Sequence, residues 1–301
     1  MTDAAAGGTR HWPGAEAAAR RALWADYRFS AAMVAPAVIL MLVFYLYPLV
    51  QVLFISVTEP TPGFGNYARL ATSSSLQRVL WTTARICALT TLIAVLLGYV
   101  VSYAMTAGSE AVRRWTLVLV VIPLWVSALE RAFAWVVVLR REGVVNSVLQ
   151  GIGLTDAPLA LVWNEIGVVI GMVHYMLPYA ILPLFANMRD IDQRAVMAAR
   201  GLGATRWQAF RRIFLPLSVP GIVASAALVL VYSLGFFVIP AILGGGKTLM
   251  IAEYVRLQIV ELVNWGLGTM LATILVAAVI VLLGLVTWSI GARRLFGGGH
   301  T

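Results

Sequence analysis

The stretch from Phe29 to Val57 reads FSAAMVAPAVILMLVFYLYPLVQVLFISV and contains no charged residue. A helix needs about 20 consecutive apolar residues to cross the roughly 30 Å hydrocarbon core of a bilayer. This run exceeds that length, and it is longer than the apolar region of a signal peptide. It therefore predicts a membrane-spanning helix, with residues 1–28 as a polar tail that stays in the cytosol.

The rest of the chain repeats this pattern. Further apolar runs of sufficient length lie near residues 82–107, 115–138, 166–188, 218–243 and 268–290. Of the 301 residues, 61% are hydrophobic and 12% are charged, whereas a soluble domain carries about 25% charged residues. Only helices satisfy all their own backbone groups in lipid. The sequence thus predicts an all-α integral membrane protein whose transmembrane domain, residues 29–291, crosses the bilayer six times.

The basic residues indicate the orientation. With the N-terminus inside, the cytosolic segments hold 14 Arg and Lys residues and the outer segments hold 6. Cytoplasmic loops carry this excess of positive charge, so we expect both termini, including the tail 292–301, in the cytosol. The net charge of +9 is explained by these topology signals, and we expect no nucleic-acid partner.

The cytosolic segment 189–216 predicts two short helices separated by a glycine hinge. Asp192 is placed to cap the first helix, since its carboxylate can accept from free backbone N–H groups. Gly201 and Gly203 favour a helix end, because glycine reaches the left-handed conformation that helix ends often need.

Thr205 can cap the second helix, and Pro216 is expected to end it and to begin the next span. Trp207, Phe210 and Phe214 recur at helical spacing and form one aromatic stripe. From periodicity alone, a basic amphipathic helix lying on the inner leaflet is an equally good interpretation.

The spacing in this segment also resembles the signature of type I permeases of binding-protein-dependent importers that are driven by ATP-binding-cassette (ABC) subunits. Their signature is Glu-Ala-Ala, three residues, Gly, nine residues, then Ile-x-Leu-Pro. The matching residues here are Ala198, Ala199, Gly203, Ile213, Leu215 and Pro216. Met197 stands where the family has its leading Glu.

Other segments resemble the polyamine-type branch of these permeases. They are the third-span motif from Arg131 to Trp135, the outer-loop segment 142–149 and the fifth-span segment 233–245. The resemblance implies a small, cationic, polyamine-like solute. Some members carry an acidic residue at the position of Phe236.

The resemblance further implies a set of partners in the bacterial inner membrane. These are a cytosolic ATPase dimer, a second permease subunit (a paralogue rather than a second copy) and a periplasmic solute-binding protein. In such permeases the 189–216 segment docks into the ATPase as a coupling helix. The residues expected to form this contact or its frame are Met197, Ala198, Ala199, Gly203, Trp207, Phe210, Ile213, Leu215 and Pro216.

Polar and aromatic residues within the spans are candidates for the translocation pathway, because charged residues in a span are costly and seldom idle. The candidates are Glu130, Arg131, Trp135, Tyr232, Ser233 and Phe236. Each also has a structural interpretation. Arg131 could lie over Trp135, Glu130 could pair with Arg85, and Tyr232 and Ser233 could be interhelical contacts.

Nothing in the sequence predicts catalysis in this chain. Gly244–Thr248 resembles part of a phosphate-binding loop, but Ala241 stands where the full pattern needs a glycine. Cys87 is the one cysteine, and His174 has no companion ligands, so no metal site is expected. We expect no cofactor, with ATP bound by the partners. The alternatives are an ion-coupled secondary transporter, which predicts paired halves and intramembrane carboxylates, and a membrane scaffold.

Overall fold

The computed structural model describes residues 32–297, and all regular structure within them is helical. The chain divides into two compact units, residues 1–54 and 55–301. The described part of the first unit is a helix that runs from Ala32 to Thr58 across the unit boundary. Its π-helical turn η1 (Leu42–Leu46) leads into α2 (Tyr47–Thr58). This helix of 27 residues coincides with the first predicted span.

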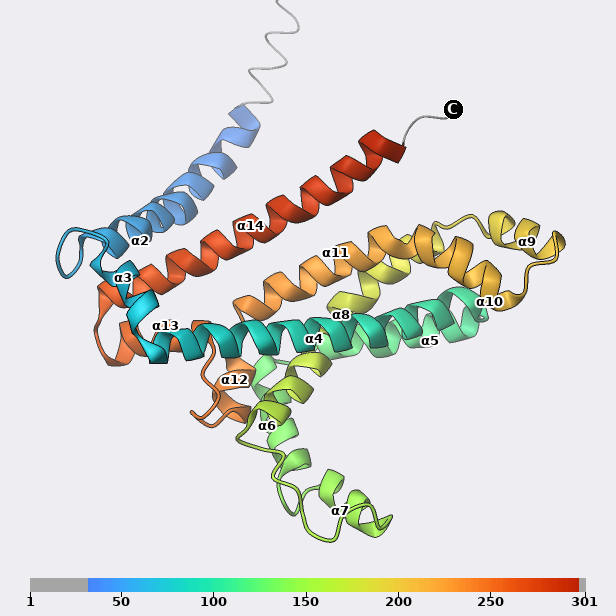
Figure 1. Cartoon of the computed structure of the whole chain (residues 1–301), viewed down its shortest axis with the longest axis horizontal. Coiled ribbons are helices and arrows are strands. Elements are labelled where there is room, and N and C mark those ends of the chain that lie inside the picture. The colour runs from blue at the N-terminus through green and yellow to red at the C-terminus, as the bar shows by residue number, and fades with distance from the viewer. Residues whose placement is uncertain (1–31, 298–301) are drawn as a thin grey trace, which may run out of the picture. The chain divides into compact units, whose positions relative to one another are not determined.

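The second unit contains the other helices (Figure 1). In chain order they are α3 (Gly65–Thr72), α4 (Ser74–Ala107), α5 (Glu110–Val121), η2 (Ile122–Trp125), α6 (Ala128–Leu139), α7 (Val144–Gly151), α8 (Glu165–Arg189), α9 (Gln193–Gly201), α10 (Arg206–Ala209), η3 (Phe210–Phe214), α11 (Leu215–Leu234), α12 (Val238–Leu243), α13 (Ile251–Arg256), η4 (Leu257–Glu261) and α14 (Trp265–Gly297).

The core of this unit is a bundle of α4, α8 and α11, which run side by side in Figure 1. Small residues let the helices approach closely. A Cβ atom added at Gly98 would lie 3.1 Å from the Cβ of Ala180, the kind of contact that membrane helices use to pack. The Tyr99 and Ser218 hydroxyls share a hydrogen bond of 3.0 Å that joins α4 to α11. The buried core is apolar and includes Ile86, Ala94, Met172, Met176 and Val229.

The predicted span at 115–138 is broken in the structure. The segments Glu110–Trp125 and Ala128–Gly151 meet at an angle of 103°. Pro123 lies at the start of the short 3-10 helix η2 and lacks a backbone donor. Ser127 then begins a new helix, since its side chain accepts a hydrogen bond of 3.2 Å from the Leu129 N–H. As a result α6 and α7 leave the bundle in a direction of their own (Figure 1).

Different elements pack against the two ends of α4. At its start, α13 is attached through the Ile251 N–H, which donates to the Thr83 hydroxyl at 2.8 Å. An apolar cluster supports this contact and includes Leu76, Val79, Met270 and Leu271. At its other end α4 meets α9 and the α10–η3 segment (Figure 1). This second end is where the predicted coupling segment lies.

Candidate functional site

The first half of the 189–216 segment has the predicted helix and hinge. The Asp192 carboxylate accepts a hydrogen bond of 2.8 Å from the Arg194 N–H and caps α9. The helix ends at Gly201, and Gly203 has a φ of +91°, a conformation that glycine adopts far more readily than other residues. The Gly203 and Ala204 N–H groups donate back to carbonyls of Arg200 and Ala199. The predicted helix end and the left-handed conformation of Gly203 are confirmed, and the role of Gly203 as a hinge stays a prediction.

The second half begins as predicted but does not end as predicted. Thr205 and Gln208 form a reciprocal capping box at the start of α10. The prediction that Pro216 ends this helix is wrong, because one helix runs from Arg206 to Leu234. The π-helical turn η3, closed by the Leu215 N–H that donates to the Phe210 carbonyl, lies immediately before α11, and Pro216 stands in the first turn of α11. The second half of the coupling segment, from Arg206 on, is therefore continuous with the helix of the fifth span.

The aromatic stripe packs against the end of α4. The ring of Tyr103 lies 5.3 Å from that of Phe210 and 5.2 Å from that of Phe214, both edge-on. Trp207 stacks on Phe210 at 5.5 Å and is 66% exposed. Phe214 is thus buried, Phe210 is half-buried and Trp207 is exposed, and the packing of the first two against α4 argues against a helix that only rests on the inner leaflet.

An exposed apolar surface remains on α9 and the turn that follows it. Met197 is 60% exposed and Leu202 is 91% exposed, and Ala198 is exposed beside them. In contrast, Ile213 and Leu215 are half-buried at the base of the span. The motif residues therefore divide into a group available to a partner and a group that anchors the helix.

Arg131 is buried at the break in the third span, and its environment differs from the one predicted. Its guanidinium carbon lies 4.0 Å from the ring centroid of Tyr175, not over Trp135. Trp135 instead donates from Nε1 to Nδ1 of His174 at 3.2 Å. Arg131 is 6% exposed, and its Nε and Nη1 atoms have no hydrogen-bond partner in the described part of the chain.

Glu130 lies in the first turn of α6 and is exposed. A carboxylate at this position is favoured by the helix dipole. The suggested pairing of Glu130 with Arg85 is not found, since Arg85 forms an ion pair with Glu165 of α8.

An aromatic ladder runs from Arg131 along α8 to α11. Tyr175 lies 4.3 Å from Phe236, Tyr175 stacks with Tyr179 at 6.1 Å, and Tyr179 stacks with Tyr232 at 4.9 Å between ring centroids. Phe236 and Tyr232 were predicted pathway residues. Tyr175 and Tyr179 were missed, although their i,i+4 spacing in the fourth span places them on one helix face.

Ser233 lies apart from the ladder. It is buried, and its hydroxyl has no hydrogen-bond partner among the described residues. The suggested interhelical polar contact of Ser233 is therefore not found as a hydrogen bond within the described chain. Tyr232 is 46% exposed and in contact with Tyr179.

The 244–267 segment contains the glycine turn that resembles a phosphate-binding loop. Gly245 and Gly246 have positive φ angles of +56° and +73° in a turn. The turn follows helix α12 and not a strand, so the segment does not form the strand–loop–helix unit of a phosphate-binding loop.

Glu253 on α13 is 7% exposed, and burial raises its pKa to about 6. Its Oε2 has no hydrogen-bond partner in the described region. Within residues 32–297, no group of three or more potential ligands could hold a metal ion.

Comparison with known proteins shows which family this chain belongs to. The family described as the binding-protein-dependent transport system inner membrane component matches residues 91–295. The chain belongs to this family. The matched residues contain both the coupling segment and the aromatic ladder. The family resemblance and the inner-membrane location predicted from the sequence are confirmed.

Individual relatives of this inner membrane component support the same conclusion. The spermidine/putrescine transport system permease protein PotB of Haemophilus influenzae is 35% identical over 71% of this chain and 76% of its own length. PotB of Escherichia coli is 31% identical over 74% of this chain and 80% of its own length. A chain of the bacterial alginate ABC transporter, solved with a periplasmic protein bound to alginate pentasaccharide, has a TM-score of 0.74 and 22% identity. The structural match covers 91% of this chain and 98% of the alginate transporter chain. This match confirms the predicted fold.

Proposed function

We propose that this chain is the permease subunit of an ATP-driven importer, and that it forms half of the pathway for a polyamine-class cation. Family membership supports the permease role. The names of the PotB relatives, at 31–35% identity, support a polyamine. The structural observation that supports a cationic solute is the aromatic ladder, because aromatic faces attract cations.

The ladder suits a long, flexible polycation. A cation within about 6 Å of an aromatic face gains roughly 0.5–1 kcal/mol when exposed and about 2 kcal/mol when desolvated. Tyr175 already holds the Arg131 guanidinium, while Tyr179 and Tyr232, which stack on each other, extend the aromatic surface along α8 and α11. Successive ammonium groups of a polyamine could occupy these faces in turn, and Glu130 offers an exposed carboxylate nearby on α6.

ATP hydrolysis is proposed to take place in separate subunits. The exposed surface around Met197, Ala198 and Leu202 is the proposed contact with an ATPase dimer. The continuous helix Arg206–Leu234 would carry its movement into the span that bears Tyr232. A second permease, expected to be a paralogue, would complete the pathway, and a periplasmic binding protein would deliver the solute. This chain would itself catalyse no reaction and bind no cofactor.

Reconstitution tests the proposal. The complete complex in proteoliposomes, with ATP supplied to the ATPase side, is assayed for uptake of labelled spermidine. Tyr179→Leu removes a ring face and should raise the apparent KM about tenfold, whereas Tyr179→Phe keeps the face and should change it by less than about threefold. Equal effects of both variants would refute the role of the ladder. Uptake driven by an ion gradient without ATP would favour the secondary transporter instead.

A further inference from the structure

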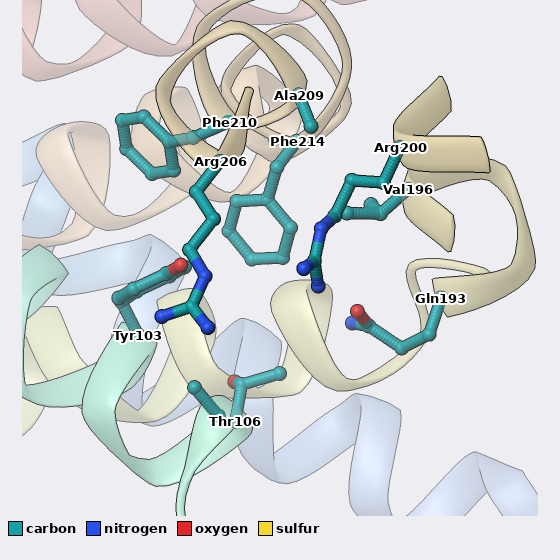
Figure 2. Close-up of a pocket in the computed structure, with 10 residues that line it drawn as sticks. Tyr103, Thr106, Gln193, Val196, Arg200, Arg206, Ala209, Phe210 and Phe214 are labelled. Atoms are coloured by element: carbon teal, nitrogen blue, oxygen red, sulfur yellow. The ribbon is translucent and has the colours of Figure 1, made fainter. Parts of the chain in front are cut away.

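The coupling segment has a second surface, on the side that faces α4. There a pocket of about 160 Å³ lies between the end of α4, α9 and the α10–η3 helix. Its polar lining residues are Tyr103, Thr106, Gln193, Arg200 and Arg206. Figure 2 shows that the Arg200 and Arg206 side chains come from opposite walls and that both guanidinium groups point into the pocket.

The two guanidinium groups give this pocket a positively charged lining. Neither forms an ion pair or a hydrogen bond with another residue of the described chain. Both arginines are exposed, and the positive charges that line this one pocket repel each other, a repulsion that a bound anion would remove. Arginine presents its N–H groups as a fork that fits phosphate or carboxylate oxygens. The Gln193 amide and the Thr106 hydroxyl add further potential donors.

An apolar groove continues directly from the basic pocket. The groove has a volume of about 440 Å³ and shares Tyr103, Arg206 and Phe210 with the pocket. Its other walls are Tyr99, Val100 and Trp207. Val100 and Trp207 are both 66% exposed. The groove thus follows α4 from its cytosolic end toward the apolar, exposed surface of the span.

We infer that an anionic phospholipid of the inner leaflet occupies this composite site, with its phosphate between Arg200 and Arg206 and one acyl chain in the groove. The position fits, because α4 ends at Ala107 beside the pocket, and residue 107 is the predicted inner end of the second span. Basic pockets on the cytoplasmic side of membrane helices bind such headgroups. A carboxylate of the ATPase or free phosphate would match the charge but would leave the groove empty.

The proposed lipid site lies between three elements. The lipid's phosphate would bridge α9 to the α10–η3 helix across the Gly203 hinge, and its acyl chain would lie along α4. The lipid would therefore hold the coupling segment against the bundle and set how well ATPase movement reaches the spans. This role depends on the cytosolic placement of the segment and not on the identity of the solute.

The test measures lipid retention in the assembled, delipidated complex by native mass spectrometry with added dioleoyl phosphatidylglycerol or dioleoyl phosphatidylcholine. The variant R200Q/R206Q should bind phosphatidylglycerol about thirtyfold more weakly than the wild type, as expected for two basic residues at an anionic headgroup. R200K/R206K keeps the charge and should lose less than about fivefold. The matched control R211Q/R212Q removes the same charge from the same segment outside the pocket, and should lose less than about threefold.

Two further measurements distinguish the sources of the anion. Dihexanoyl phosphatidylglycerol has the same headgroup and should bind at least about tenfold more weakly than the dioleoyl lipid, because the groove is left unfilled. Excess inorganic phosphate should not displace the dioleoyl lipid.

Equal loss in R200Q/R206Q and R211Q/R212Q would overturn the proposal in favour of diffuse surface charge. Equal binding of the two chain lengths, or displacement by phosphate, would indicate a site for a free anion. Unchanged lipid retention in R200Q/R206Q with loss of the ATPase subunit from the complex would indicate a carboxylate partner instead.

Discussion

The Gly203 hinge gives the sharpest mutational test of the coupling segment. Its φ is +91°, and a Cβ atom added there would meet nothing within 4 Å. The effect of Gly203→Ala is therefore a backbone effect with no steric clash. An L-residue held in this region costs about 1–2 kcal/mol, which disfavours the native loop geometry by about fivefold to thirtyfold.

Gly201 supplies a matched control two residues earlier. It is the last residue of α9, has no positive φ, and its added Cβ would also meet nothing within 4 Å. Gly201→Ala should be neutral or stabilise α9 by about 0.5–1 kcal/mol. The two variants therefore add the same methyl group to open space and differ only in the conformation of the backbone.

The assay is solute-stimulated ATPase activity of the assembled complex, with membrane insertion of each variant measured alongside. Gly203→Ala should reduce the stimulation about fivefold or more, while Gly201→Ala should retain it. Equal stimulation in the two variants, with equal insertion, would refute the argument that the left-handed hinge transmits the movement of the ATPase.

Three other predictions concern the remaining segments. Cysteines replacing Ala204 and Lys247, in a background without Cys87, should be labelled by an impermeant thiol reagent in intact cells only at 247; labelling at 204 alone would reverse the topology. Glu130→Gln should raise the apparent KM for a polyamine about tenfold in uptake assays. An unchanged KM in a well-expressed variant would show that Glu130 does not contact the solute. Burial raises the pKa of Glu253 from 4.5 to about 6, so the folded state holds this proton more tightly than the unfolded chain. The resulting stabilisation, at most about 2 kcal/mol, is complete below pH 4.5 and is lost as the pH rises through 6. Thermal unfolding of Glu253→Gln should lack this pH-dependent step, and a step of the same size in the variant would contradict the assignment.

The continuous helix Arg206–Leu234 explains how a surface contact could act on the pathway. A helix transmits rotation and translation along its axis without a flexible joint, and the joint here lies before Thr205 rather than at Pro216. Tyr232 lies near the far end of the same helix, in contact with Tyr179. Movement that passes from α9 across the Gly203 joint to α10 would therefore reach the aromatic ladder along one continuous helix.

Local features of the chain could be predicted from the sequence alone. The apolar runs predict the spans because each must bury its backbone groups in lipid regardless of what surrounds it. Asp192, Gly203 and Thr205 predict the caps and the hinge because these act within three or four residues of their own position. The spacing from Ala198 to Pro216 likewise indicated the family before any contact between helices was known.

Contacts between distant segments were decided only by the tertiary structure. Arg131 has Trp135 within one turn of its own helix, yet it lies over Tyr175 of α8, because the break after Trp125 reorients α6. Arg85 likewise pairs with Glu165 rather than Glu130. The pocket between Arg200 and Arg206 exists only because α9 folds back beside the end of α4. Hydropathy and helix period describe what each residue prefers along its own helix, whereas its partners depend on how the helices pack against each other.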